Sequence, residues 1–175
     1  MGLFSGIDKT KPRKDANYWR DGHYLALVER VGKVETRVSG DGIAIECRII
    51  RVLGTGLDSP HQPDETVSQL LLDKYDASGG NFVAFLMTAG GLKESDITDE
   101  SAADVYGDEN PLAYTVLEIF CKKGETRGKK VPFVFVNYRR RITAIETDSM
   151  LTQDEKERFF PEGLLESLKE MEAAD

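Results

Sequence analysis

Alternation of apolar and polar positions recurs along the chain and predicts five β-strands. The first predicted strand begins near His23 and covers residues 22–37, which are rich in Val, Leu and Tyr. An Asp-Gly turn leads from it into a second alternating segment at 43–53. Three further strands are expected at 66–73, 113–123 and 129–142. The second strand places four apolar residues on one face: Ile43, Ile45, Cys47 and Ile49.

Helical spacing replaces this alternation in two regions. Apolar residues recur at helical spacing within residues 77–91, and a Gly pair suited to end a helix closes the segment. In the acidic segment that follows, Thr98 is positioned to cap a further helix. Within residues 147–175, Thr152 and Glu155 have the spacing of a capping box, and a stripe of leucines comes after them. This tail is predicted to form two short helices.

The order of the predicted elements favours one fold class. Three strands, a helix and two more strands are the order of an OB-fold, a five-stranded and partly open barrel. We therefore expect a mainly β protein. Residues 1–146 would form an OB-fold-like barrel with an N-terminal extension, and residues 147–175 an acidic, helical C-terminal tail. The alternative is an α+β sandwich built from the same elements.

Charge is distributed unevenly along the chain. The 175 residues carry a formal net charge of -8. Between Lys122 and Arg141, however, eight basic residues face Glu125 as the one acid, whereas the tail has nine acidic and three basic residues. Clustered positive charge makes an anionic ligand compatible with an acidic total.

The fifth predicted strand interleaves aromatic residues with these cations. One face carries Phe133 and Phe135 and the other carries valines and Tyr138. If the valine face lies in the core, the two Phe rings are exposed beside cations, as in a stacking platform for nucleic-acid bases. If the Phe face lies in the core, the exposed aromatic residue is Tyr138. Trp19, which follows Tyr18, has the same two interpretations, a stacking residue or a hydrophobic plug at the barrel end.

The predicted nucleic-acid contacts follow from this pattern. Cations would hold phosphates, and Tyr138, Trp19 and one Phe would stack on bases. The candidate residues are Lys122, Lys123, Arg127, Lys129, Lys130, Phe133, Phe135, Tyr138, Arg139, Arg140, Arg141 and Trp19.

Catalytic chemistry has little support in the sequence. No metalloprotease, nucleophile-elbow, paired-cysteine or phosphate-loop motif occurs. His23 and His61 are expected at the surface or in turns, and Cys47 and Cys121 are expected to be buried free thiols. The acids of residues 96–100 are interpreted as a solvated loop rather than a metal site. We expect a binding protein without cofactor or metal, and without a membrane span.

Several segments resemble a known group of proteins. Gly22 and Tyr24 match the "GxY" opening strand of a family of small phage and large-virus proteins. The family closes its barrel with a hairpin of the type T-x-x-G-K-x-F-x-x-V-x-W. That hairpin is approximated here by Thr126, Gly128, Lys129, Phe133, Val136 and Tyr138, with Tyr in place of Trp and one extra residue before Phe133. The resemblance covers about the first four fifths of the chain. It implies an OB-fold-like barrel and a loose grouping with single-stranded-DNA-binding proteins.

Two functional hypotheses follow. The first is sequence-tolerant binding of single-stranded DNA in phage DNA replication or recombination, in the cytoplasm of an infected bacterial host. The acidic tail would then compete for the basic surface or recruit replication and recombination proteins, and the chain is a candidate homo-oligomer. The second is a phage structural, assembly or host-interaction protein, in the virion or the host, which uses the barrel as a scaffold for protein binding.

Overall fold

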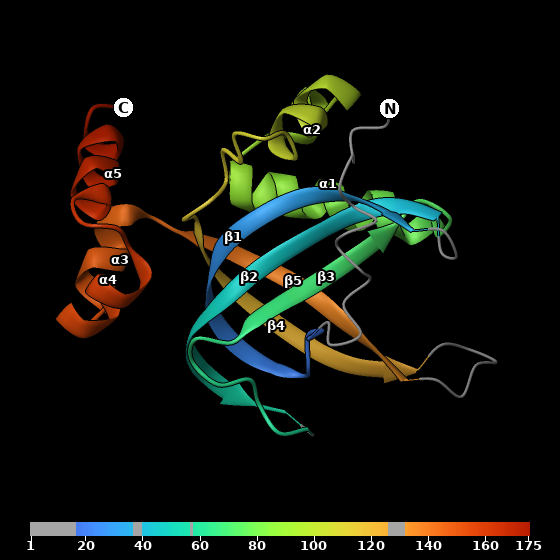
Figure 1. Ribbon diagram of the computed structural model, residues 1–175, viewed down its shortest axis with the longest axis horizontal. Helices are drawn as coiled ribbons and strands as arrows, with labels where there is room; N and C mark the ends of the chain where they lie inside the picture. Colours follow the sequence, from blue (N-terminus) through green and yellow to red (C-terminus); the bar gives the residue numbers. More distant parts are fainter. Residues whose placement is uncertain (1–16, 37–39, 57, 126–131) are drawn as a thin grey trace.

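A strongly curved antiparallel sheet of five strands forms the centre of the molecule (Figure 1). The computed structural model describes residues 17–36, 40–56, 58–125 and 132–175. The strands follow one another in the sheet in the order β3-β2-β1-β4-β5. They are β1 (Gly22–Thr36), β2 (Gly40–Thr55), β3 (Thr66–Leu72), β4 (Val116–Glu125) and β5 (Pro132–Ile142).

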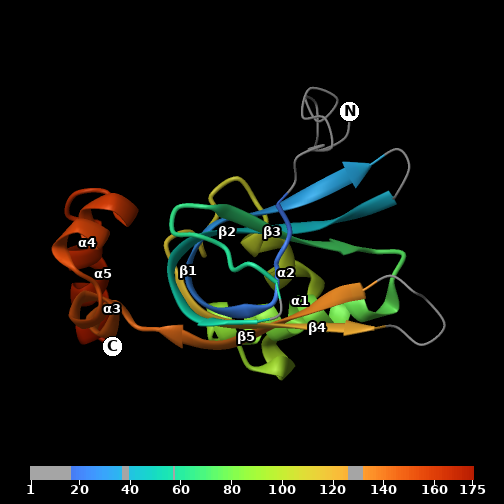
Figure 2. The ribbon, with the colours of Figure 1, turned by 90° about the horizontal axis from the view of Figure 1, so that it is seen from below.

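The helices lie on two sides of this sheet (Figures 1 and 2). The first group, between β3 and β4, comprises α1 (Asp76–Gly90), the short 3-10 helix η1 (Glu94–Asp96) and α2 (Asp99–Val105). The second group follows β5 and comprises α3 (Ala144–Met150), α4 (Gln153–Phe159) and α5 (Leu164–Ala173). The tail thus has three helices where the sequence predicted two. The missed helix, α3, has only seven residues and no long apolar stripe, and it begins at a Thr143 side chain that accepts a hydrogen bond from the Glu146 amide.

The sheet does not close into a barrel. β3 and β5 are its two edges, so the predicted five-stranded, partly open OB-fold-like barrel is not confirmed. The edges are nevertheless linked by side chains, because the Tyr138 hydroxyl on β5 donates a hydrogen bond to the Gln69 side chain on β3. Helix α1 packs against both edge strands and fills the open side, with the Thr88 hydroxyl donating to the Tyr138 carbonyl at 3.0 Å. The coarser prediction, a mainly β protein with five antiparallel strands and short helices, is confirmed.

The main core lies on the inner, concave face of the sheet. Alternate residues of β1, β2 and β4 pack there with the apolar side of α1, and the predicted inner face of β2 is confirmed by the burial of Ile45, Cys47 and Ile49. Val134 and Val136 of β5 also pack against this core, so the valine face of the fifth strand is the inner one. Of the two predicted orientations of β5, the structure therefore shows the one in which the valine face lies in the core and the Phe face lies outside.

The opening of β1 depends on a glycine. Gly22 has a backbone φ of +145°, and a Cβ atom there would lie 2.6 Å from the Tyr24 hydroxyl oxygen. Tyr24 is fully buried and donates to the Asp21 carbonyl at 3.0 Å. Because its ring lies over residue 22, a side chain at that position would displace it, which gives the Gly22–Tyr24 pair a steric explanation.

A second core joins the tail helices to the outer face of the sheet. Leu25 and Leu27 of β1 pack there with residues of β2, β4 and β5 and with apolar residues of the tail, among them Phe159 and Leu165. An ion pair adds to this contact, because the Arg51 guanidinium donates two hydrogen bonds to the Glu155 carboxylate. The tail is therefore docked along the sheet, and the predicted boundary at residues 146/147 falls within α3.

The segment before β1 is anchored by a buried histidine. His61 lies in the loop before β3, as the sequence indicated, but it is fully buried, so the expected surface position is wrong. Its Nε2 atom accepts a hydrogen bond of 2.9 Å from the Arg20 amide, and its Nδ1 atom lies 3.2 Å from a Glu65 carboxylate oxygen. Burial, aided by the Arg20 charge, lowers the pKa of His61, which favours the neutral imidazole. His61 is thus a structural link between the N-terminal segment and the loop before β3.

The two thiols are part of the inner core. Cys47 and Cys121 are free and buried, as the sequence predicted. Burial raises the pKa of both thiols, that of Cys121 to about 12, so neither is a reactive thiolate at neutral pH.

Among the described residues, no helix is long and apolar enough to cross a membrane.

Candidate nucleic-acid interface

The tail helices leave part of the outer sheet face uncovered. This part, here called the outer strip, lies on the first residues of β1, on β4 and on β5. Most of its members alternate with buried residues of the inner core, which fixes the direction of their side chains. The exception is the consecutive pair Arg139 and Arg140, which a β-bulge opposite Glu118 and Ile119 puts on the same face. The outer strip consists of His23, Glu118, Phe120, Lys122, Phe135, Asn137, Arg139 and Arg140.

Two Phe rings are exposed on the outer strip. Phe135 is 58% exposed and Phe120 is 38% exposed. Phe135 stands opposite Lys122 in the β4–β5 register. The Phe120 ring has the His23 ring at its edge, with centroids 5.9 Å apart, and the Arg139 guanidinium over it at 5.4 Å. The strip therefore offers the Phe135 ring and the Arg139–Phe120 pair as two flat surfaces.

The cations of the outer strip differ in how far their charge is compensated. Lys122 and Arg139 are exposed, and within the described part of the chain neither has an acidic side chain at ion-pair distance. Arg140 instead donates to Glu118 at 2.7 Å and to Glu146 of α3 at 3.0 Å. Lys122 and Arg139 are consequently the cations available to an external anion.

Glu118 organises the polar side of the outer strip. One of its carboxylate oxygens accepts from Arg140, and the other lies 2.7 Å from His23 Nε2. The Arg140 hydrogen bond, with a further contribution from His23, holds the pKa of Glu118 below its usual value. Glu118 is thus ionised at neutral pH and fixes both neighbours against the sheet.

Three predicted contact residues project away from the outer strip. The Lys123 ammonium lies 3.3 Å from an Asp58 carboxylate oxygen, and the Arg141 guanidinium donates to the Ala89 carbonyl at the end of α1 at 3.3 Å. Tyr138 is buried in the inner core with its ring 5.0 Å from that of Phe85. Lys123 and Tyr138 lie on the other face from Phe135 by strand alternation, and Arg141 does so because a β-bulge in β5, opposite Glu118 and Ile119, shifts the alternation by one residue. The stacking role expected of Tyr138 is therefore wrong.

Trp19 is also unable to stack on a ligand. It is 4% exposed and packs against Tyr24 and His61, with ring centroids 5.6 and 5.8 Å away. Of the two interpretations of Trp19, a stacking residue or a hydrophobic plug, the structure agrees with the hydrophobic plug. The exposed aromatic residue of this segment is Tyr18, which lies at the edge of β3.

Part of the predicted surface lies outside the described residues. Arg127, Lys129 and Lys130 belong to the β4–β5 connection, which the structure does not describe. Phe133 is placed by its backbone, which pairs with Gly124, but its side chain is also outside the described set. Four of the twelve predicted residues are therefore seen on the outer strip: Lys122, Phe135, Arg139 and Arg140.

Sequence reasoning missed three members of the outer strip, Phe120, His23 and Asn137, as ligand contacts. Phe120 stands between Ile119 and Cys121 in an apolar run, so the composition of this segment does not indicate that the Phe120 side chain is exposed. The available signal was the alternation with Glu118 and Lys122, which puts the intervening Phe120 on the polar face of the strand. His23 and Asn137 join it only through the register of β1 and β5 with β4.

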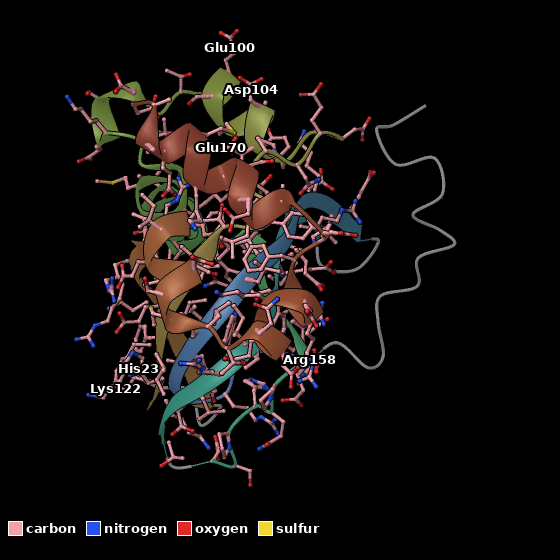
Figure 3. The ribbon with its side chains drawn as sticks, turned by 90° about the vertical axis from the view of Figure 1, so that its left-hand side faces the viewer. His23, Glu100, Asp104, Lys122, Arg158 and Glu170 are labelled. Carbon is pink, nitrogen blue, oxygen red and sulfur yellow. The ribbon has the colours of Figure 1, made fainter. Side chains whose placement is uncertain are left out.

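Two residues of the outer strip lie apart from three acids of the helices. In Figure 3, His23 and Lys122 are at the lower left, whereas Glu100 and Asp104 of α2 and Glu170 of α5 are towards the top. These three acids are thus separated in space from Lys122. No protein-family model matches the chain, and no curated protein matches it in sequence.

Proposed function

We propose that this protein binds single-stranded DNA, with little sequence preference, through the outer strip. One observation carries the proposal: two exposed Phe rings share a face with Lys122 and Arg139, whose charges have no acidic partner among the described residues. Aromatic faces and uncompensated cations are the two components that single-strand-binding surfaces combine. The sequence resemblance to phage proteins supports the same proposal.

Stacking explains why the ligand would be single-stranded. A base can lie on the Phe135 ring or on the Arg139–Phe120 pair only if its own face is free, which a duplex does not allow away from its ends. Base–aromatic stacking contributes roughly 1–3 kcal/mol per base and tolerates every base, since each has a π face. Phosphate contacts to Lys122 and Arg139 add a salt-sensitive contribution.

The sheet supports a further proposal about fold, that it is an opened OB-fold. Its strand order, with α1 between β3 and β4, is that of such a barrel cut between strands 3 and 5, and the Tyr138–Gln69 hydrogen bond crosses the cut. OB-folds often use strands 2 and 3 and the loops after strands 1 and 4. In this protein the proposed surface is shifted to strands 1, 4 and 5, beside the connection that contains Arg127, Lys129 and Lys130.

The resemblance also suggests the biological setting. We place the protein in phage DNA replication or recombination, in the cytoplasm of the infected bacterium, with replication and recombination proteins as partners of the tail. We further propose that it acts by binding and not by catalysis, because the sequence offers no motif that pairs a nucleophile with a base. Reproducible DNA cleavage with magnesium or manganese, abolished by substitution of Asp96 or Asp99, would overturn the non-enzymatic assignment.

A gel-shift series tests the proposal. Full-length protein is titrated with single-stranded and duplex oligonucleotides at several salt concentrations, and we expect preferential binding of the single strand that weakens steeply with salt. Lys122→Ala and Arg139→Ala should each flatten the logarithmic salt slope by about 0.7. Phe135→Ala should lower affinity about five- to 150-fold, as expected for roughly 1–3 kcal/mol of stacking, and leave the salt slope unchanged.

Matched controls come from exposed residues elsewhere. Lys93→Ala removes an exposed cation and Tyr75→Ala an exposed aromatic ring, both away from the outer strip, and neither should change binding. Equal effects of Lys93→Ala and Lys122→Ala would show that any cation serves and that the outer strip is not the site. Absence of binding by the wild-type protein at low salt would reject DNA binding altogether.

The second candidate function has its own observation. Ile145 of α3 and Met171 of α5 are 50% and 66% exposed on the docked tail, which suits a protein partner. If the chain assembles with a phage or host protein without binding DNA, Ile145→Ser and Met171→Ser should weaken that assembly, whereas Phe135→Ala should leave it unchanged. The reverse pattern would exclude the tail as the docking surface.

A further inference from the structure

Asn137 occupies the middle of the outer strip. It lies on β5 between Phe135 and Arg139 and stands opposite Phe120 in the β4–β5 register. The side chain is exposed, and within the described residues its amide has no hydrogen-bond partner. Phe135 and Asn137 project from the same face about 7 Å apart, the spacing of alternate residues in a strand.

This position brings an amide to the edge of a stacked base. A base that lies flat on the Phe135 ring directs its edge along the sheet surface, and Asn137 is the next side chain on that surface. An asparagine amide supplies a donor and an acceptor side by side. The Watson–Crick edge of every DNA base also has a donor next to an acceptor: N6–H and N1 in adenine, N4–H and N3 in cytosine, N1–H and O6 in guanine, N3–H and O4 in thymine.

We propose that Asn137 pairs with the Watson–Crick edge of the base stacked on Phe135, so that the outer strip selects unpaired bases without choosing among them. The inference rests on the proposed function. Because the exposed amide can rotate by half a turn, it matches either order of donor and acceptor, and all four bases are accepted. A base already paired in a duplex has no free Watson–Crick edge and therefore cannot form this contact with Asn137.

The neighbouring side chains do not supply this chemistry. Lys122 and Arg139 carry donors only, and a surface that read base edges through them alone would favour acceptor-rich guanine. The Glu118 oxygens are engaged by Arg140 and His23, and the bond to Glu118 also occupies His23 Nε2. Among the described residues of the outer strip, Asn137 therefore combines a free donor with a free acceptor.

A modified base isolates the contact. Two thymidine oligonucleotides of about 12 nucleotides, within the site sizes of single OB-folds, are compared. One is unmodified and the other carries N3-methylthymidine, which stacks like thymine but has lost the N3–H donor. The wild-type protein should bind the methylated strand about tenfold more weakly, and Asn137→Ala should bind both strands alike. Since residue 137 is exposed, Asn137→Ala should retain the wild-type melting temperature.

A second variant tests base tolerance. Asn137→Asp keeps the shape but presents two acceptors, which match the adjacent N1–H and N2–H donors of guanine and no other base. Its affinity for an oligonucleotide of alternating thymidine and guanosine should exceed that for oligothymidine by about tenfold, whereas the wild-type protein should bind the two within about threefold.

The outcomes separate this inference from the proposed function. If wild-type protein binds oligothymidine and methylation weakens wild type and Asn137→Ala equally, binding of single strands stands and the role of Asn137 is rejected. The same holds if Asn137→Asp acquires no preference for guanosine. If the wild-type protein binds neither strand at low salt, both proposals fail together.

Discussion

A single hydroxyl group spans the open side of the sheet. The Tyr138 hydroxyl on β5 donates a hydrogen bond to the Gln69 side chain on β3. The Tyr138 ring packs against Phe85 of α1, and the Tyr138 backbone carbonyl accepts a hydrogen bond from the Thr88 hydroxyl. Burial raises the pKa of the phenol well above its usual value, so the group remains a donor at any pH near neutrality. Tyr138 thus connects both edge strands and the helix between them, and its contribution is to stability.

We expect Tyr138→Phe to lower the free energy of unfolding by about 1 kcal/mol, the usual net value of such a hydrogen bond. The DNA affinity of the folded variant should remain that of the wild type, because the ring lies on the inner face. Urea unfolding and gel shifts measure the two quantities. A large loss of affinity at unchanged stability would instead return Tyr138 to the binding surface. Gln69→Ala, which removes the acceptor, serves as the matched variant.

A strongly stabilised carboxylate is among the contacts that hold helix α4 to the sheet. Glu155 accepts from the Arg51 guanidinium and also from the amide of Thr152, which caps the helix. The Arg51 hydrogen bonds, supported by the cap, hold the pKa of Glu155 at about 2. The folded-state pKa therefore lies below the value of about 4.3 expected in the unfolded chain. This contribution to stability is complete above about pH 5 and is lost as the pH falls towards 2.

The variant Glu155→Gln should consequently be less stable than wild type at pH 7, and the difference should shrink as the pH is lowered from 5 to 3. Urea midpoints measured across this range provide the test. Glu157→Gln, an exposed acid on the same helix, is the control and should show a nearly constant difference from wild type. A pH-independent deficit for Glu155→Gln would mean that the cap, and not the charge, carries the effect.

On the scale of the whole molecule, two cores share one sheet. The inner core includes α1 and the buried faces of all five strands, whereas the outer core consists of the tail helices and the face of the sheet that they cover. Tail acids are engaged inside this assembly, since Asp148 pairs with Lys156 and Lys169, and Glu172 accepts from the first amides of α3. In the described residues, the contact of α3–α5 with the outer strip is the Glu146–Arg140 pair.

Truncation after Glu146 should therefore leave a chain that still unfolds cooperatively, because the inner core stays complete. Its melting temperature should fall and it should bind a hydrophobic dye, since Leu25, Leu27 and Ile50 lose their cover. Calorimetry and dye fluorescence measure both effects. Loss of a cooperative transition would make the tail part of a single folding unit. Its DNA affinity should change little, because Glu146 is retained; a large gain would show that distal tail acids compete for the strip.

The sequence predicts the positions of the helices and strands better than it predicts which of their side chains are buried. Alternation located the five strands and the helical spacing located α1, because both periods are local. Burial of Tyr138 and Trp19 could not be predicted in this way, since it depends on which face of β5 meets α1 and on how the N-terminal segment packs on His61. The position of His23 and Asn137 beside Phe120 follows from the β1–β4–β5 register, and register is a property of paired strands and not of one segment.

Lys122 lies at the lower left of Figure 3 and Glu100, Asp104 and Glu170 lie towards the top, so these opposite charges are separated along the molecule. In the field of a polyanion such a body is turned while it is still diffusing, and its acidic end is directed away. If the outer strip binds DNA as proposed, a larger share of encounters begins with this strip facing the strand, which raises the association rate at low salt without adding a contact. Under the proposed function, acids far from the outer strip thus contribute to the orientation in which the protein approaches DNA.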